Sequence, residues 1–522
     1  MSGLRVESLA PVMSARGSRP RPRNIALTAI ATGVGMLLLL PLVAVLANAQ
    51  SAGWREFSTV LFRERSLTLL INTLALPLVV TPIAAFLGTA AAWYTERTAL
   101  PGRRIWTVLL VLPIAMPDFI VGYAWHTIAP TASPLGAAVL VMSLSSYPLI
   151  YLPVAAALRR SDPALEEAAR SLGLSQTRTF FRVVLPSIRS AILGGCLIVV
   201  LVLVSEFGAF EIVRFQTFTT EIFTEFQVNP SAAGALSIPL VLIGILVVIG
   251  ESVVPVPRSS SRPGIRRPSL IRLGGGAWGL CVGLVVLVGL AVAVPVGALV
   301  YWMSSSQHTT LPAQATVLQA TLTTCEYCAG GALLAVLLAL PIALLSARSR
   351  RGLSLVVERS TYLTLALPGV VIALSLIFLS LRFAFGLYET SWLVIAGYAI
   401  ITFPLALSCL KTSVRQAPAE LTAVGRSLGR SAPYVFLRVT LPLIAPGLVA
   451  GFCLVFLTAT TELTATLVLQ PPDTVTLSTQ FWAFQSESAY GAAAPYGLVI
   501  IVLSMVPGTL LAIWFDRVGQ RQ

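Results

Sequence analysis

The sequence predicts an all-α integral membrane protein with about twelve transmembrane helices. Hydrophobic residues make up 56% of the 522 positions, charged residues only 11%, and the mean hydropathy is +0.86. A soluble protein usually has about 25% charged residues. Apolar runs long enough to cross the hydrocarbon, which takes roughly 20 residues, recur along the whole chain. They cover about 25–48, 67–95, 105–127, 134–158, 191–213, 234–255, 274–302, 317–346, 360–384, 391–410, 447–469 and 491–515.

The placement of the basic residues predicts the orientation of these helices. If the N-terminus lies inside and the chain crosses twelve times, 30 of the 35 Lys and Arg residues fall on the inner side. This asymmetry follows the positive-inside rule, so the net charge of +14 indicates topology and no nucleic-acid partner. We therefore expect a multi-pass membrane protein with both termini in the cytoplasm. The run at 25–47 is longer than a signal-peptide core of about 7–15 residues, which favours a retained helix.

A Pro-, Ser-, Gly- and Arg-rich segment divides the chain into two halves. The expected order is a cytoplasmic tail (1–24), a first half (25–255), a cytoplasmic linker (256–273), a second half (274–515) and a short tail (516–522). Six helices in each half give both halves the same orientation, so a pseudo-twofold axis along the membrane normal should relate them. The interface between the halves is the natural pathway for a substrate.

Each half carries one polar, basic loop between its fourth and fifth helices. We call these the first loop (159–190) and the second loop (411–446). Residues 170–186 and 426–442 are identical at ten of seventeen positions. A repeated polar loop in a membrane protein indicates two equivalent docking surfaces. The alternative is an amphipathic helix that rests on anionic lipid.

The first loop has the residues of a short helix–turn–helix. Asp162 before Pro163 is a favourable helix start, and Gly173 permits a turn with positive φ. A second short segment should end at Pro186, where the next transmembrane helix is expected to begin.

The spacing of the first loop resembles a known family. Its residues Glu167-Ala168-Ala169-x3-Gly173-x9-Val183-x-Leu185-Pro186 are similar to the EAA loop of ABC importer permeases. The resemblance implies a type I importer (MetI-like) fold with two fused halves, in which each loop docks into one copy of a cytoplasmic ABC ATPase. It also implies an extracytoplasmic solute-binding protein as a partner, and surrounding membrane lipid.

The second loop departs from this pattern at its start. Ala423 and Val424-Gly425 replace the glutamate and the alanine pair, while Gly429, Leu441 and Pro442 are retained. Glu420, one turn earlier, is the candidate substitute for the glutamate.

Segments after the loops resemble the ferric-iron transport permeases. These are Glu206-Phe207-Gly208-Ala209 in the first half and Thr461 to Leu467 in the second, although a lysine is usual at position 461. Related fused permeases carry thiamine, aminoethylphosphonate or other small solutes, so the resemblance leaves these alternatives open.

Three acidic residues are candidates for the substrate pathway. Glu206, Glu462 and Asp118 fall in apolar segments, where an ionisable group is costly and suggests a function. A pair of carboxylates would suit a cation such as Fe(III). The alternatives are structural carboxylates at positions 206 and 462, and a helix cap at position 118.

The sequence contains no motif for catalysis or for a bound cofactor. Its single lysine, Lys411, follows Leu410, whereas a P-loop requires glycine before the lysine. ATP and Mg²⁺ should therefore be used by the partner ATPase, and this chain should be a transport subunit and no enzyme. Cys325 and Cys328 form a lone CxxC, and with two histidines in the chain we expect no metal site. The remaining alternative of another class is an ion-coupled secondary transporter.

Overall fold

The computed structural model describes residues 25–161, 163–253, 270–271, 276–305, 311–348 and 352–519, and the chain is helical throughout most of these ranges. Within them there is no β-strand, and one isolated parallel bridge joins Thr98 and Ile271. Helices satisfy their backbone polar groups internally, as a hydrocarbon environment requires. The prediction of an all-α fold is confirmed.

The described part of the first half contains long helices separated by short ones. They are α1 (Ile25–Leu61), α2 (Glu64–Arg97), α3 (Arg103–Val111), η1 (Leu112–Ala115), α4 (Asp118–Ile128), α5 (Pro134–Arg160), α6 (Pro163–Ser171), α7 (Gln176–Thr179), η2 (Phe180–Val184), α8 (Leu185–Ser205), α9 (Gly208–Ile212), α10 (Phe218–Val228) and α11 (Pro230–Val253).

The second half repeats this order. Its helices are α12 (Gly276–Val288), η3 (Gly289–Ala293), α13 (Val294–Ser305), α14 (Gln314–Arg348), α15 (Leu353–Tyr362), η4 (Leu363–Ala366), α16 (Gly369–Phe383), η5 (Phe385–Leu387), α17 (Ser391–Gln416), α18 (Ala419–Ser427), α19 (Ala432–Val435), η6 (Phe436–Thr440), α20 (Leu441–Thr460), α21 (Thr464–Leu469), α22 (Leu477–Ser486) and α23 (Tyr490–Gly519).

The number of membrane spans agrees with the prediction. Among the described residues, ten helices are long and apolar enough to cross a membrane, and two bent helix pairs bring the total to twelve. The two spans expected at 105–127 and 360–384 are the bent pairs, and each breaks at a proline. The first pair is bent by 91° and the second by 107°. Met116, which precedes Pro117, is extended, since a following proline disfavours the helical conformation.

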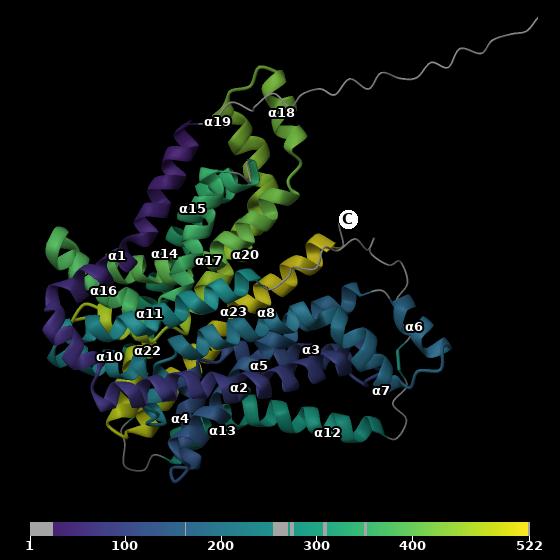
Figure 1. Ribbon diagram of the computed structural model, residues 1–522, viewed down its shortest axis with the longest axis horizontal. Coiled ribbons are helices and arrows are strands. Elements are labelled where there is room, and N and C mark those ends of the chain that lie inside the picture. The colour runs from purple at the N-terminus through teal and green to yellow at the C-terminus, as the bar shows by residue number, and fades with distance from the viewer. Residues whose placement is uncertain are drawn as a thin grey trace, which may run out of the picture.

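The first helix of each half packs against the other half. α1 lies against α11 of its own half and then against α14, α15 and α16, whereas α13 lies against α4 and α12 against α3. Figure 1 shows this exchange, with α1 beside α14 to α16 and with α12 and α13 beside the helices of the first half. The two halves of the sequence are therefore interlocked in space.

The buried apolar residues form two clusters, and each draws on both halves. One cluster joins Tyr147 of the first half with Phe481 and Tyr496 of the second. The other joins Phe218 of the first half with Phe403 of the second. Neither half could bury its apolar surface in this way without its neighbour.

Small residues allow a close approach between the halves. A Cβ atom at Gly244 of α11 would lie only 2.1 Å from the carbonyl oxygen of Ala366 in η4. Glycine is frequent where membrane helices pack, since it lets two backbones come this near.

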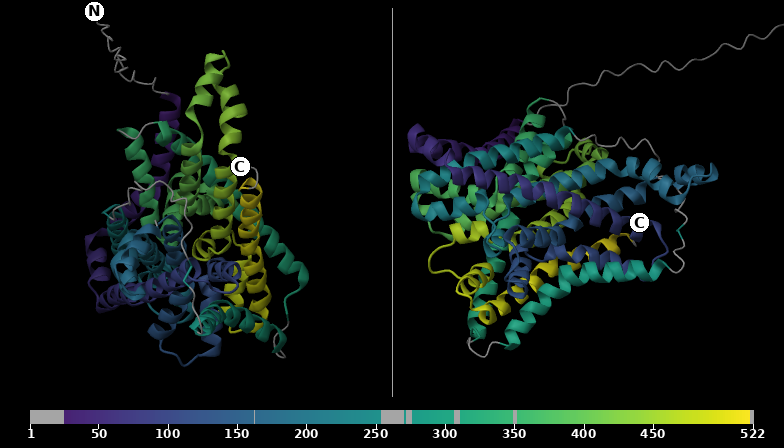
Figure 2. Two further views of the ribbon diagram at one scale, coloured as in Figure 1. Left: turned by 90° about the vertical axis from the view of Figure 1, so that its right-hand side faces the viewer. Right: turned by 60° about the horizontal axis from the view of Figure 1, so that its bottom comes forward.

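The helices of the two halves diverge towards the loops. In Figure 1, α2, α5 and α8 run to α6 and α7 at the right, whereas α17 and α20 rise to α18 and α19 at the top. The opposite ends meet at the lower left, near α4, α10, α16 and α22. Figure 2 shows the same divergence from two further sides.

Only a small part of the predicted linker is described. Ile271 pairs with the end of α2: its N–H donates to the carbonyl of Arg97 (2.9 Å), and its carbonyl accepts from the N–H of Ala99 (3.0 Å). The rest of the linker, the tail at 1–24 and residues 520–522 lie outside the described residues, so the domain boundaries stay predictions.

Candidate functional site

The first loop forms the helix–turn–helix that its sequence predicts. α6 ends in a turn at Gly173, whose φ is +84°. The N–H of Gly173 donates to the carbonyl of Arg170 (2.9 Å), and that of Leu174 donates to the carbonyl of Ala169 (3.1 Å). This pair of bonds is the Schellman motif, in which a left-handed residue after the helix satisfies its last carbonyls. The predicted cap at Asp162 lies outside the described residues.

The second loop makes the same turn despite its different sequence. Gly429 has a φ of +76° and donates to the carbonyl of Arg426 (3.1 Å), and Arg430 donates to the carbonyl of Gly425 (3.3 Å). The departures at Ala423 and Val424 therefore leave the turn intact.

Inside each loop, two residues from its two short helices pack together, and the sizes of the two residues differ between the loops in opposite directions. Ala169 and Thr179 are buried in the first loop, and their equivalents in the second are Gly425 and Val435. A Cβ at Gly425 would lie 3.0 Å from Cγ2 of Val435. The second loop has thus moved apolar volume from one helix to the other.

The Leu-Pro pairs of the two loops lie inside continuous helices. The helix α8 begins at Leu185, directly before Pro186, as predicted, but α7 and η2 lead into it without a break, so one apolar span runs over Gln176–Ser205. A π-helical turn, η2, comes directly before Leu185 and Pro186, and η6 comes directly before Leu441 and Pro442. A proline lacks the N–H for the usual bond, and a wider turn relieves the clash of its ring with the preceding turn.

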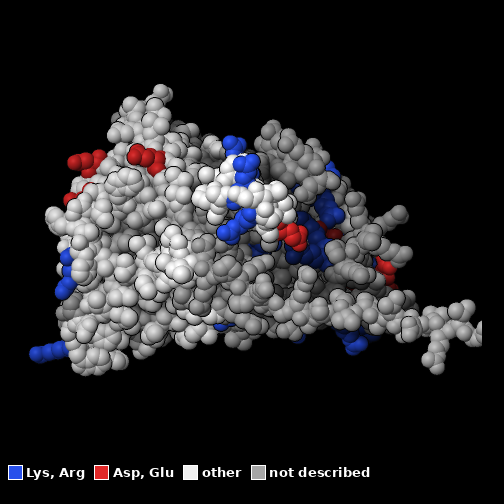
Figure 3. Space-filling model, turned by 90° about the horizontal axis from the view of Figure 1, so that it is seen from above, with Lys and Arg blue, Asp and Glu red and all other residues white. Residues whose placement is uncertain are grey.

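Each loop presents apolar side chains to solvent. Leu172 is 83% exposed and its equivalent Leu428 is 74% exposed. Glu167 and Ala168 are exposed on the first loop, and Glu420 is exposed on the second. Figure 3, seen from the top of Figure 1, shows Lys and Arg side chains over the protruding second loop. Exposed apolar residues within a basic surface are typical of a protein–protein contact.

A buried ion pair anchors the first loop to the body. Arg97 at the end of α2 contacts Glu166 of α6 at 2.9 Å, and the two side chains are 2% and 8% exposed. Arg97 also donates to the hydroxyl of Ser161, and Arg170 lies 4.0 Å from Glu166. Glu167 was predicted from the sequence pattern, whereas Glu166 was not. The helical period could have found Glu166, since it shares one face with Ala169 and Arg170.

The second loop carries no equivalent of this anchor on its helix, because Thr422 stands in place of Glu166. Its half has another ion pair, between Lys411 of α17 and Glu358 of α15. That pair joins two helices of the body and does not involve α18.

The three predicted pathway acids lie at helix breaks. Asp118 begins α4, and Glu206 and Glu462 follow the ends of α8 and α20 that lie away from the loops. Glu206 accepts a bond from the N–H of Ala209 (2.8 Å), and Glu462 from the N–H of Ala465 (3.0 Å). Each of these two carboxylates therefore caps a short helix, as the structural alternative expects.

The acids are close to one another and remain accessible. Asp118 and Glu462 both act on Glu206 through their charges, and all three residues are partly exposed. No group of three or more metal-ligating side chains that could hold one ion occurs in the described ranges.

The two halves differ in polarity at these breaks. Gly369 begins α16 where Asp118 begins α4. A Cβ at Gly369 would lie 2.9 Å from Oε1 of Glu462 and 3.7 Å from Cδ1 of Ile401. Ser145, the equivalent of Ile401, faces Asp118 in the first half. The first half thus places a carboxyl and a hydroxyl group where the second half has none.

Buried apolar residues follow each acid directly. Phe119, Phe207 and Leu463 are at most 3% exposed. A Cβ at Gly208 would lie 2.9 Å from Leu463 and 3.0 Å from Phe119, and the ring of Phe119 lies 5.4 Å from that of Phe481. These contacts join the two halves beside the acids.

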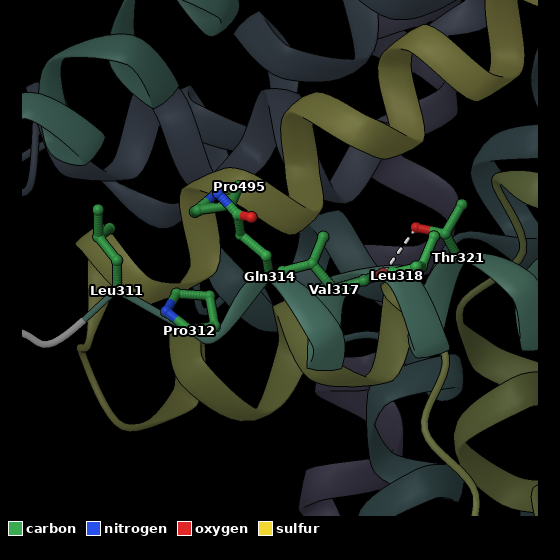
Figure 4. Close-up of a pocket in the computed structure, with 7 residues that line it drawn as sticks. All are labelled: Leu311, Pro312, Gln314, Val317, Leu318, Thr321 and Pro495. Carbon is green, nitrogen blue, oxygen red and sulfur yellow. Dashed lines mark hydrogen bonds between the residues drawn. The ribbon is translucent and has the colours of Figure 1, made fainter.

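An apolar pocket lies away from the acids. It encloses about 400 Å³ at the start of α14, and Figure 4 shows its α14 residues beside Pro495 of α23. Its lining is Leu311, Pro312, Gln314, Val317, Leu318, Thr321 and Pro495. With no charged side chain in that lining, it offers nothing to an ion.

The predicted CxxC residues pack within the helices. Cys325 and Cys328 are free thiols, Cys328 is buried, and it accepts a bond from the hydroxyl of Thr460 at 3.7 Å.

Comparison with known proteins agrees with the duplicated architecture. Residues 36–255 and 339–522 match the family described as binding-protein-dependent transport system inner membrane component. The chain belongs to this family. It is a permease of the ABC importer type, a multi-pass inner membrane protein with two fused copies of the family's fold.

The permease is similar to several proteins that are named as transport permeases. It is 37% identical over 499 residues to the Fe(3+)-transport system permease protein FbpB 2 of Haemophilus influenzae, which covers 94% of this chain and 99% of that protein. It is 29% identical over 192 residues to the sulfate transport system permease protein CysT of Escherichia coli, covering 34% of this chain and 69% of that protein. A probable molybdenum ABC transporter permease protein of Haloferax volcanii is 30% identical over 234 residues, covering 42% and 86%.

Proposed function

We propose that this permease moves ferric iron into the cytoplasm and is driven by two copies of an ABC ATPase that dock on the first and second loops. An extracytoplasmic binding protein delivers the iron at the opposite face. In this orientation both termini and both loops lie in the cytoplasm, membrane lipid surrounds the helices, and ATP and Mg²⁺ act at the partner.

The observation that carries the proposal is the similarity over nearly the whole chain to a protein named for Fe(3+) transport. The sulfate and molybdenum relatives match less than half of the chain.

The charges at the helix breaks support a cation as the substrate. Asp118, Glu206 and Glu462 line one region and carry no cationic partner among the ion pairs of the described residues. A region lined by one sign of charge attracts the opposite sign and repels its own. Sulfate and molybdate would be repelled here, whereas carboxylate oxygens suit a hard cation.

The loops support an external source of energy. The chain lacks a P-loop lysine, and two loops with the same glycine turn offer an exposed leucine each. Closure of two ATPase copies would draw the loops together, and the halves would exchange between two packings as rigid bodies. The divergence of the helices towards the loops in Figure 1 fits the state that faces the cytoplasm.

A substrate competition experiment tests the proposal. The permease is reconstituted in proteoliposomes with its ATPase and its binding protein, and the uptake of radioactive Fe(III), sulfate, thiamine and aminoethylphosphonate is measured with ATP. We expect uptake of iron alone. Uptake of another solute without iron would overturn the substrate assignment.

A further inference from the structure

A basic pocket lies at the loop end of the first half, away from the acids described above and beside the start of the first loop, to which its Arg159 belongs. It encloses about 340 Å³ where the ends of α2, α3 and α5 meet. Its lining is Glu96, Arg103, Arg104, Thr107 and Arg159, which we call the arginine pocket.

One buried carboxylate orients two of the three guanidinium groups. Glu96 is 2% exposed, and its two oxygens lie 2.5 Å from Arg103 and 2.6 Å from Arg159. Both arginines remain partly exposed, at 37% and 56%. Each therefore has donors left for a further partner, because a guanidinium group carries five N–H donors.

Arg104 adds a charge that the pocket does not neutralise. It is exposed and makes no hydrogen bond or ion pair with the rest of the described chain. Three cations around one carboxylate leave an excess of two positive charges. A pocket of this charge and of oriented guanidinium groups fits a phosphate-bearing anion.

The surroundings of the pocket identify the source of the phosphate. On α3, Ile105 and Val108 are each 66% exposed and point outward, as side chains do when they face lipid. Trp106 lies between them and donates its indole N–H to the carbonyl of Pro101 (3.1 Å). Tryptophan is enriched at the level of lipid headgroups, so the pocket opens where a headgroup would sit above an acyl chain on α3.

We propose that the arginine pocket binds the headgroup of an anionic phospholipid in the leaflet on the loop side. Basic pockets between membrane helices near this surface are suited to such headgroups. The proposal goes beyond iron transport and does not depend on the substrate.

The second half lacks two of the pocket's arginines at the corresponding positions of its sequence. Positions of α2 to α4 correspond to those of α14 to α16 at an offset of 251, as Asp118 and Gly369 show. Ser354 and Leu355 then stand in place of Arg103 and Arg104, and Glu358 stands in place of Thr107. The arginine pocket, as the described residues form it, therefore belongs to the half whose loop is anchored.

The pocket is connected to the anchor of the first loop. Glu96 precedes Arg97, and Arg159 lies two residues before Ser161, whose hydroxyl accepts from Arg97. A bound headgroup would hold Arg103 and Arg159 in place, and would steady the end of α2 that carries the anchor.

Native mass spectrometry of the full-length permease in neutral detergent tests the proposal. Phosphatidylglycerol and phosphatidylcholine are titrated separately, and the apparent affinity of the first bound lipid is compared. We expect phosphatidylglycerol to bind more tightly. Arg104→Gln should weaken it about five-fold, as one arginine near the surface contributes about that factor. Arg104 has no internal partner, so this variant should fold.

The matched control is Arg359→Gln on α15, which removes an exposed arginine from the corresponding helix of the other half. It should leave the affinity for phosphatidylglycerol unchanged. Equal affinities for the two lipids, or equal losses in both variants, would overturn the proposal. Displacement of the lipid by millimolar inorganic phosphate would assign the pocket to the free anion instead and would also overturn it.

A second measurement separates lipid from a protein partner. If the pocket contacts the ATPase, Arg104→Gln should reduce ATPase binding in lipid-free detergent. The lipid proposal predicts unchanged binding there and is overturned by a reduction.

Discussion

The first and second loops share a backbone but differ in their attachment. Both end a short helix with a left-handed glycine, Gly173 or Gly429, and both continue through a π-helical turn into a Leu-Pro pair. Only the first has a buried carboxylate, Glu166, that an arginine of the body holds. The turn depends on backbone geometry and has been kept, whereas the attachment depends on single side chains and has diverged.

In a fused chain, the two halves have separate sequences and can therefore differ from each other. In a pair of identical subunits, any anchor would occur twice. Here the first half combines the anchor, the additional acid Asp118 and the arginine pocket, and the second half has Thr422, Gly369 and Glu358 at the corresponding places. We infer that the first half is the firmer attachment for its ATPase and the more polar wall of the passage.

The largest effect should come from removing the anchor. Glu166→Ala leaves Arg97 buried without its carboxylate, and the loss of one partner of a buried ion pair costs about 3–5 kcal/mol. ATP-driven iron uptake in proteoliposomes should then fall to background, while Thr422→Ala in the second loop should be near wild type.

A double variant checks that the anchor acts by position. Arg97→Met with Glu166→Leu removes both charges, and an apolar pair of similar volume is often neutral in stability. Uptake should recover in part. Full activity of Glu166→Ala, or equal losses from Glu166→Ala and Thr422→Ala, would contradict the difference between the loops.

The next effect concerns the acids. Asp118→Asn replaces one of the three carboxyl groups by an amide and should lower the initial rate of iron uptake about ten-fold, which corresponds to about 1.4 kcal/mol. Gly369→Ala is the matched variant in the second half. It should displace the Glu462 carboxylate, whose Oε1 lies 2.9 Å from the new Cβ position, and lower uptake to a smaller degree. A larger effect of Gly369→Ala than of Asp118→Asn would contradict the inference that the first half is the more polar side.

The sequence predicted the repeated parts of this molecule better than the parts that differ. Apolar runs and basic clusters depend on composition, and a glycine with positive φ has few substitutes, so the spans and both turns could be read from the pattern. The bends at Pro117 and Pro368 could have been suspected from proline. Their angles depend on packing between distant helices, which a single sequence does not show.

The exchange of helices and the anchor were not predicted for a related reason. That α1 packs on α14 to α16 depends on contacts between residues about 300 positions apart. Arg97 and Glu166 lie in different helices, and neither residue belongs to the repeated motif. The sequence singled out Glu206 and Glu462 as candidates for the pathway, but their roles as caps of α9 and α21 required the geometry of the breaks.

A smaller and equal effect is expected at the two turns. Gly173→Ala and Gly429→Ala each place a Cβ on a left-handed residue, at a cost of about 1–2 kcal/mol. No atom lies within 4 Å of either new Cβ, so only backbone strain should act. The affinity of the detergent-solubilised permease for its ATPase should fall by a similar factor in both variants. Unequal losses would show that the turns are less alike than their hydrogen bonds.

The smallest effect should come from changing the packing between the two short helices of the second loop. Gly425→Ala places a methyl group 3.0 Å from Val435. This should destabilise the packing of α18 on α19 by about 1 kcal/mol. Adding Val435→Thr, which recreates the pair of the first loop, should restore it. Limited proteolysis of the second loop measures the change, and no rescue by the second substitution would reject the compensation.

The central claim is that this permease is passive and is driven through its two loops. Uptake of radioactive Fe(III) into proteoliposomes tests it directly, with the ATPase, the binding protein and ATP each omitted in turn. We predict that uptake requires all three and that a proton or sodium gradient cannot replace ATP. Robust uptake by the permease alone under an ion gradient would contradict the account and would favour a secondary transporter.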